Sequence, residues 1–213
     1  MKSAIIFDFD YTLADSSKGA VECINYALQS MGEAPRSWDD CCATIGLSLP
    51  DAYKSLTRKS NPEKAATFHC LFVERADQIM ASNTELYDGV GNLVHRLTSS
   101  GFVLGILSTK FRYRIFQILE RYELTDQFSV IVGGEDVEKN KPDPEGLHLF
   151  LSKTSMKPEQ VVLVGDSLTD AETALRSGID FIAVLTGTTS ADQFSAYSPK
   201  AILQSVIEIE TYA

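Results

Sequence analysis

The sequence is poor in the residues that bind soft metal ions. Its 213 residues include four cysteines and three histidines. Cys41 and Cys42 are adjacent, and the chain has no CxxC pair and no histidine at metal-ligand spacing. We therefore interpret the cysteines as reduced, mostly buried small side chains, and the histidines as structural or surface residues.

Long apolar runs and long basic runs are also missing from the sequence. No apolar stretch approaches the roughly 20 residues of a membrane-spanning helix, and no block of Lys and Arg is typical of nucleic-acid binding. The formal net charge is -10, and the opening MKSAIIFDFD reaches carboxylates too early for a signal peptide. We expect a cytoplasmic protein that binds neither nucleic acid nor a membrane. Both a monomer and a dimer remain open.

Short apolar runs alternate with helical patterns through most of the chain. The composition, 44% hydrophobic and 23% charged, is ordinary for a globular protein. Near-continuous apolar runs separated by helices favour a parallel sheet covered on both faces. The fold class is therefore α/β, with a Rossmann-like core. The predicted strands are 4–7, 102–107, 130–132, 161–164 and 181–185, and the predicted helices between them are 90–100, 112–122, 145–153 and 171–177.

One long segment interrupts this alternation. Residues 16–82 contain several helical patterns and no convincing strand, which indicates an inserted helical cap domain. Its helices are expected over 18–31, after Ser37 as N-cap, from Asp51, and after Asn61 with Pro62 at the first helical position. The predicted domains are the catalytic core, residues 1–15 and 83–213, and the cap, residues 16–82.

Polar side chains follow four of the predicted strands. The stretches are DFDYT, STK, KNKPDP and GDSLTD. Because the carboxyl ends of parallel strands meet at one edge, these residues should lie together. Several carboxylates in one crevice require a hard cation, and Mg²⁺ prefers such oxygen ligands. A hydroxyl and a lysine beside them suit an oxyanion such as phosphate. The residues brought together are Asp8, Asp10, Ser108, Thr109, Lys141, Asp166 and Asp170.

In this order and spacing, DFDYTL, ILSTK, KNKPDPEGL and VLVGDSLTDAETA resemble the motifs of the haloacid dehalogenase superfamily. The helical insertion after the first motif resembles the cap of the subgroup that contains phosphoglycolate phosphatases, β-phosphoglucomutases and haloacid dehalogenases. The resemblance covers the chain from Asp8 to Asp170. It implies a phosphatase that acts on a small phosphorylated metabolite with Mg²⁺ as cofactor.

The resemblance also implies a role for each carboxylate. Asp8 is the expected nucleophile, which forms a phospho-aspartate. Asp10 is the expected general acid, and then the general base that activates water. The expected metal ligands are the Asp8 side chain, the Asp10 backbone carbonyl and Asp166. Asp170 is expected to act behind these ligands or through water.

The phosphate-binding residues implied by the resemblance are Thr12, Ser108, Thr109 and Lys141. Ser108 and Lys141 are expected to neutralise the transferring phosphoryl group. Lys139 lies two residues from Lys141 and competes with it as a candidate, but the KP dipeptide favours Lys141.

Substrate specificity is less clearly marked. Tyr11 stands where the family most often has glycine, and we expect it to affect the fit of the cap or the choice of leaving group. Gly46 and Ser48 lie in a segment that resembles the specificity loop of such caps. For Lys110, Arg112 and Arg114 the pattern favours an ordinary exposed helix face. The alternative is contact with an acidic group of the substrate, for which Lys110 is the best candidate because it is nearest the site.

Several activities remain to be compared. Asp10 argues against a dehalogenase, because dehalogenases of the family lack this acid. A phosphonate hydrolase needs a cap lysine in a context that is not found, and a receiver-type binding module has no cap. Phosphoglycolate is the substrate that the resemblance favours. Pyrophosphate, sugar phosphates and nucleotides follow, and a phosphomutase of the β-phosphoglucomutase type is a further alternative.

Overall fold

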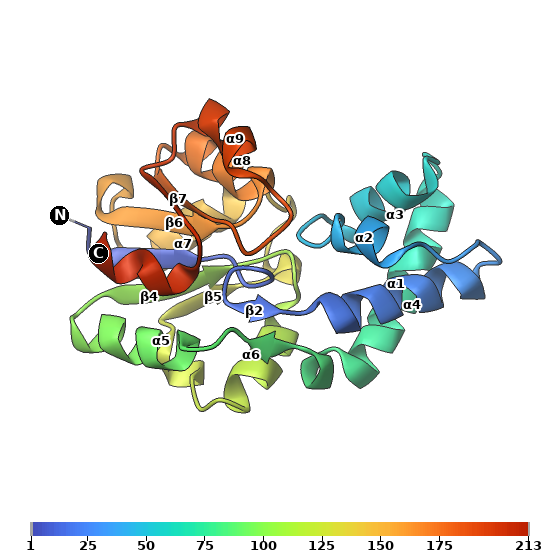
Figure 1. The fold of residues 1–213 in the computed structure, drawn as a ribbon, viewed down its shortest axis with the longest axis horizontal. Helices are drawn as coiled ribbons and strands as arrows, with labels where there is room; N and C mark the ends of the chain where they lie inside the picture. Colours follow the sequence, from blue (N-terminus) through green and yellow to red (C-terminus); the bar gives the residue numbers. More distant parts are fainter. Residues whose placement is uncertain (1, 213) are drawn as a thin grey trace.

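The computed structural model describes residues 2–212 of the chain. Within them, parallel strands form one six-stranded sheet in the order β5-β4-β1-β6-β7-β8. The sheet lies at the centre of the larger of two lobes (Figure 1). Its strands are β1 (Ala4–Phe7), β4 (Val103–Leu107), β5 (Val130–Val132), β6 (Val161–Gly165), β7 (Asp180–Val184) and β8 (Ala201–Leu203).

The central strands are apolar because they are covered on both faces. Every residue of β1 and β6 is buried. The five strands predicted from the sequence are confirmed, and the α/β class with them. The sixth strand, β8, was not predicted; its middle residue, Ile202, is exposed at the sheet edge.

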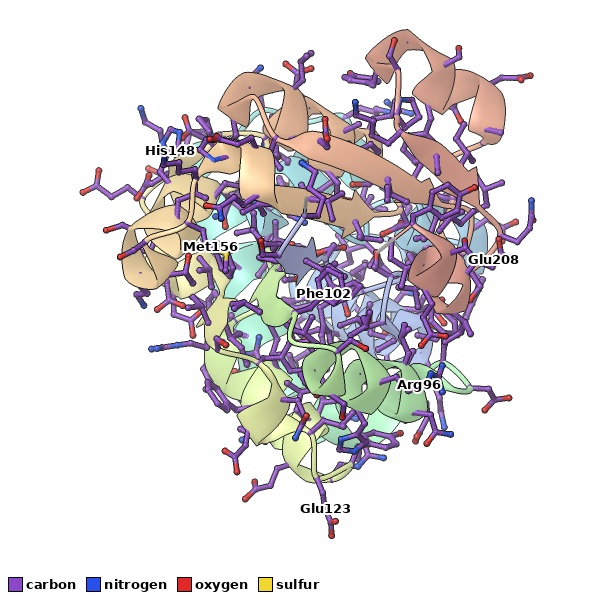
Figure 2. All side chains as sticks on the ribbon, turned by 90° about the vertical axis from the view of Figure 1, so that its left-hand side faces the viewer. Arg96, Phe102, Glu123, His148, Met156 and Glu208 are labelled. Carbon is purple, nitrogen blue, oxygen red and sulfur yellow. The ribbon has the colours of Figure 1, made fainter. Side chains whose placement is uncertain are left out.

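Helices cover the two faces of the sheet and close two apolar cores. Leu93 of α5 and Ile115 of α6 pack on one face, and Phe150 of α7 and Ala174 of α8 pack on the other. Figure 2 views the amino ends of the strands, with Arg96 of α5 and His148 of α7 on opposite sides of the sheet. These helices are α5 (Val90–Ser99), α6 (Arg112–Glu120), α7 (Glu145–Thr154), α8 (Leu168–Ser177) and α9 (Ala191–Phe194).

The second lobe is a helical bundle with its own core. Leu28, Tyr53 and Phe68 are fully buried within it. A small antiparallel pair, β2 (Ala14–Asp15) and β3 (Glu85–Leu86), lies where the chain passes between the lobes. The bundle helices are α1 (Ser17–Ser30), α2 (Trp38–Cys42), α3 (Leu49–Thr57) and α4 (Pro62–Ile79). The predicted domain boundaries at 15/16 and 82/83 stay predictions.

Side-chain caps set where these helices begin. The N-caps predicted at Ser37 and Asn61 each accept a hydrogen bond from the backbone N–H three residues on. The third bundle helix begins earlier than predicted, because Ser48 rather than Asp51 provides its cap. In the core, α8 also begins three residues before the predicted position, because Ser167 caps it.

Short 3-10 helices complete the connections. They span Ala81–Asn83, Thr125–Gln127, Gly134–Asp136, Pro158–Gln160, Ser195–Tyr197 and Val206–Thr211. Within residues 2–212, none of the helices combines the length and the apolar character needed to span a membrane.

Candidate active site

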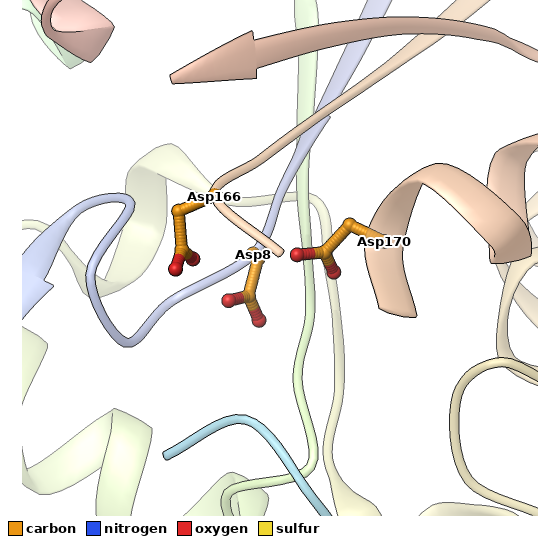
Figure 3. A group of neighbouring side chains, drawn as sticks. All are labelled: Asp8, Asp166 and Asp170. Atoms are coloured by element: carbon orange, nitrogen blue, oxygen red, sulfur yellow. The ribbon is translucent and has the colours of Figure 1, made fainter. Parts of the chain in front are cut away.

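Three carboxylates meet at the carboxyl edge of the sheet. Because Phe7 of β1 pairs with Val164 of β6, the residues that follow both strands leave the sheet side by side. Asp8 and Asp166 come from these two strands, and Asp170 comes from the first turn of α8. Figure 3 shows the three side chains facing a common space. One oxygen of each lies within 4.8 Å of the others, and all three residues are buried.

Lys141 is the cation in contact with this cluster. Its Nζ donates to Asp8 Oδ1 at 2.7 Å and to Asp170 Oδ1 at 2.5 Å. Ser167 binds the other oxygen of Asp170, through its backbone N–H at 3.1 Å and its hydroxyl at 2.5 Å. Both carboxylate oxygens of Asp170 therefore have hydrogen-bond partners, and one of them holds Lys141 in place. Lys139, the competing candidate, is exposed.

One lysine does not balance three buried carboxylates. Burial raises the pKa of Asp8 to about 7, with Asp170 adding to the rise and Lys141 opposing it. Burial, together with the charges of Asp8 and Asp170, also raises the pKa of Asp166 well above its usual value. Oxygen donors with excess negative charge fit a hard divalent cation such as Mg²⁺. The cluster could therefore hold such an ion.

Two glycines allow this crowding, and sequence reasoning missed their role. A Cβ on Gly187 would lie 1.9 Å from Asp166 Oδ2, and one on Gly165 would lie 2.5 Å from the carboxyl carbon of Asp170. Any larger residue at either position would displace a carboxylate. Gly187 follows β7 in the stretch TGTTS, which resembles no recognised motif, so only the fold reveals the contact.

Asp10 lies beside the cluster and is held by two other groups. Its Oδ1 accepts a hydrogen bond from the Ser16 hydroxyl at 2.6 Å, and Lys110 Nζ lies 3.0 Å from the same oxygen. The side chains of Lys110 and Asp10 are 7% and 8% exposed. The exposed position favoured for Lys110 is therefore wrong, because the side chain is buried against the predicted general acid. The substrate contact named as its alternative stays a prediction.

The hydroxyls of Ser108 and Thr12 have different partners. Ser108 Oγ accepts the backbone N–H of Lys110 at 3.2 Å, which leaves its own proton free to be donated. Thr12 Oγ1 donates to Asp166 Oδ1 at 3.1 Å, and so orients that carboxylate. The phosphate contact expected for Thr12 stays a prediction.

Tyr11 adopts a left-handed backbone conformation, with φ of 61°. This conformation costs a non-glycine residue about 1–2 kcal/mol, which agrees with the glycine that the family resemblance leads us to expect at this position. The phenol packs against Cys42 of α2, and burial with that contact raises the Tyr11 pKa. The Thr186 hydroxyl donates to the Tyr11 carbonyl. Tyr11 thus joins the core to the cap.

A cavity of about 590 Å³ lies between the two lobes. Gly46 and Ser48, predicted as specificity residues, both line it. The Gly46 carbonyl accepts from Thr109 Oγ1 at 3.3 Å, so this hydroxyl contacts the cap, and the phosphate contact expected for it stays a prediction. Ser48 Oγ donates to Asp51 Oδ2 at 2.6 Å while it caps α3.

Arg114 corrects one expectation about α6. An exposed helix face was expected, but Arg114 is 3% exposed. Its Nε and Nη2 donate to Asp77 Oδ1 at 3.0 and 2.6 Å, and Nη2 also reaches the Val73 carbonyl at 3.1 Å. Both partners lie on α4 of the cap. The helical pattern could not reveal this because the cap is distant in sequence.

The parallel sheet, the acidic cluster at its carboxyl edge and the helical cap over a cavity define a capped α/β protein with a buried acidic site. A family profile described as haloacid dehalogenase-like hydrolase matches residues 5–184, which is most of the chain. The chain therefore belongs to the haloacid dehalogenase-like hydrolases.

Individual relatives agree with this family. The chain is 37% identical to a haloacid dehalogenase-like hydrolase from Bacteroides fragilis, whose crystal structure superposes with a TM-score of 0.95, covering 98% of this chain and 100% of the other. It is 27% identical to a phosphoglycolate phosphatase of Salmonella choleraesuis over 94% of this chain and 88% of the relative. It is also 27% identical to the pyrophosphatase PpaX of Halalkalibacterium halodurans, over 97% and 94%.

Proposed function

We propose that the protein is a Mg²⁺-dependent phosphatase that hydrolyses a small phosphorylated metabolite through a phospho-aspartate on Asp8. The observation that carries the proposal is the contact of the Asp8 carboxylate with Lys141, beside the separately held Asp10. The two carboxylates are thus held by different lysines, Asp8 by Lys141 and Asp10 by Lys110. Relatives named as phosphoglycolate phosphatase and pyrophosphatase support the reaction class.

In the first step, an oxygen of Asp8 attacks phosphorus and the bond to the leaving oxygen breaks. Asp10 gives its proton to that leaving oxygen, so that an alcohol departs and a phospho-aspartate remains. Ser16 and Lys110 both contact one oxygen of Asp10, so the other oxygen is available for the proton transfer.

Ser108 and Lys141 bind the phosphoryl oxygens during the transfer. The Ser108 hydroxyl has a proton to donate, because its oxygen accepts the Lys110 N–H. The Lys141 ammonium is positioned by Asp170 and offsets the negative charge that gathers on the phosphoryl group. Both side chains are almost fully buried, which strengthens their electrostatic effect.

Asp8, Asp166 and the Asp10 backbone carbonyl would hold Mg²⁺. When bound, the ion lets an anionic carboxylate approach an anionic phosphate. Thr12 keeps Asp166 oriented for this purpose. Asp170 acts behind the ligands, through its contact with Lys141.

In the second step, Asp10 accepts a proton from water, and the water oxygen attacks phosphorus. The bond between phosphorus and Asp8 breaks, inorganic phosphate leaves, and Asp10 is protonated again for the next cycle. The same residue thus serves first as acid and then as base.

Among the substrates suggested by the resemblance and by the names of relatives, phosphoglycolate is the first candidate and pyrophosphate the second. Sugar phosphates and nucleotides remain alternatives, and a phosphomutase would use the same core residues. The cytoplasmic location stays a prediction.

Phosphate release tests the proposal. Wild type and Asp8→Asn are compared on a panel of phosphate monoesters and pyrophosphate, with and without Mg²⁺, and exposed Asp126→Asn serves as control. We expect turnover that depends on Mg²⁺ in wild type and in the control, and its loss in Asp8→Asn. Equal activity of Asp8→Asn, or no turnover of any substrate, would contradict the proposal.

A further inference from the structure

We propose that the cavity between core and cap selects phosphate esters whose leaving group is uncharged and partly apolar. This inference rests on the phosphatase function proposed above and names the substrate class for the same site. It differs from the two substrates that the named relatives suggest, because glycolate carries a carboxylate and the leaving group of pyrophosphate is itself phosphate.

The cap side of the cavity is largely apolar. Helices α1 and α4 present aliphatic and aromatic side chains toward it, and the loop between α2 and α3 adds another. Contact with such a wall favours carbon atoms of the leaving group and gives nothing to a charge. The apolar residues in question are Ala20, Ile24, Leu47, Phe72 and Met80.

Among the described residues that line the cavity, every lysine and arginine already has an acidic partner. Lys141 is bound by carboxylates of the cluster, and the proposed chemistry assigns it to the phosphoryl group. Lys110 is paired with Asp10 at 3.0 Å. Arg114 is bound to Asp77 at 2.6 Å. Each cation in this set already contacts a side chain of the protein, so a second anionic group could bind one of them only by displacing that contact.

Acidic residues at the cavity make a second negative charge still less favourable. Asp51, Glu135 and Glu138 line it together with Asp10. Glu135 accepts only a neutral backbone N–H, from Arg112. An anionic leaving group would be desolvated beside an apolar wall and repelled by these carboxylates.

The remaining polar groups are neutral. Burial, together with the charge of Arg114, lowers the pKa of His69 below its ordinary value, so its imidazole is uncharged at pH 7. This ring lies edge-on to Phe111, with the ring centroids 6.1 Å apart. The amide of Asn140 also lines the cavity. An imidazole and an amide can bind hydroxyl groups, and the neighbouring aromatic rings suit an apolar face.

The size of the cavity agrees with this chemistry. About 590 Å³ falls within the range of roughly 300–1,000 Å³ that holds small-molecule ligands. Two carbons of a glycolate leaving group would leave most of that space unfilled. A leaving group of the size of a polyol or sugar fits better.

Matched pairs of esters test the inference. The pairs are phosphoglycolate with 2-hydroxyethyl phosphate, and 3-phosphoglycerate with glycerol 3-phosphate, each differing in one carboxylate. We expect kcat/KM to be at least about tenfold higher for the uncharged member of each pair, and pyrophosphate to rank below both uncharged members. Equal or reversed ranking overturns this inference alone. Hydrolysis of pyrophosphate alone also overturns only this inference, whereas no hydrolysis of any ester or of pyrophosphate overturns the phosphatase function, and this inference with it.

A charge placed on the cap should change the preference. Leu47 is half-buried on the loop between α2 and α3 and lines the cavity. We expect Leu47→Lys to raise the ratio of phosphoglycolate to 2-hydroxyethyl phosphate kcat/KM by about fivefold or more, and Leu47→Met to leave the ratio unchanged. Retained hydrolysis of 2-hydroxyethyl phosphate shows that each variant is folded. If Leu47→Lys leaves this kcat/KM ratio unchanged, the lack of a cation is not what disfavours the carboxylate, and the inference is contradicted.

Discussion

The core edge and the cap wall face the same cavity, yet they are built from opposite chemistry. At the core edge, buried carboxylates and lysines lie in contact, with Lys141 bound by Asp8 and Asp170. Across the cavity, Ile24 and Phe72 of the cap offer apolar surface. This difference supports the proposal that the core carries out the reaction and the cap selects the leaving group. The predictions below separate these two contributions.

The largest effect is expected at the nucleophile. Asp8→Asn removes the attacking carboxylate but keeps its size, so kcat should fall by about 10⁴-fold or more. The measurement is the rate of phosphate release on the best substrate of the panel. The exposed Asp126→Asn variant should retain wild-type kcat. A fall of less than tenfold would show that Asp8 does not form the covalent bond.

Removal of the buried cation should cost stability as well as activity. Lys141→Met leaves Asp8 and Asp170 without their partner in a site that is almost fully buried. We expect the free energy of unfolding to fall by about 3–5 kcal/mol, measured by urea denaturation. Exposed Lys139→Met, two residues away, should change it by less than about 0.5 kcal/mol. Similar values for both variants would contradict the pairing.

The pH dependence of stability tests the excess negative charge at the core edge. The pKa of Asp8 is raised to about 7 in the folded protein, above its value of about 3.9 in an unfolded chain. The folded state therefore holds this proton more tightly. The resulting stabilisation is complete below about pH 4 and is lost as the pH rises through 7.

Asp8→Asn has no such proton to lose. In EDTA, its free energy of unfolding relative to wild type should therefore increase between pH 4 and pH 7.5, by at least about 1 kcal/mol. Urea denaturation at the two pH values measures this difference. Asp126→Asn should show no comparable change. Mg²⁺ should stabilise wild type and so reduce the difference in the free energy of unfolding between Asp8→Asn and wild type. A difference independent of pH would contradict the raised pKa.

The two regions also differ in how well the sequence predicts them. Asp8 and Ser108 directly follow an apolar run, and Asp166 follows one after a single glycine. Parallel strands bring such positions to one edge, so their proximity could be predicted. The pairing of Lys110 with Asp10 and the burial of Arg114 could not, because each depends on how elements distant in sequence pack together. For the same reason, the lining of the cap depends on how its helices lie over the core.

Tyr11 connects the two regions, and the smallest effect is expected there. Tyr11→Gly relieves the left-handed backbone conformation but removes the phenol that packs against Cys42 of the cap. The two changes have opposite effects on the free energy of unfolding, so we expect little net change in stability. The weaker contact between core and cap should raise KM by about threefold. The ratio of phosphoglycolate to 2-hydroxyethyl phosphate kcat/KM should stay unchanged, because Tyr11 is not among the cavity-lining residues of the described chain. Tyr11→Phe should keep the wild-type KM if packing matters more than the hydroxyl. A changed substrate ratio in Tyr11→Gly would instead show that Tyr11 takes part in choosing the leaving group.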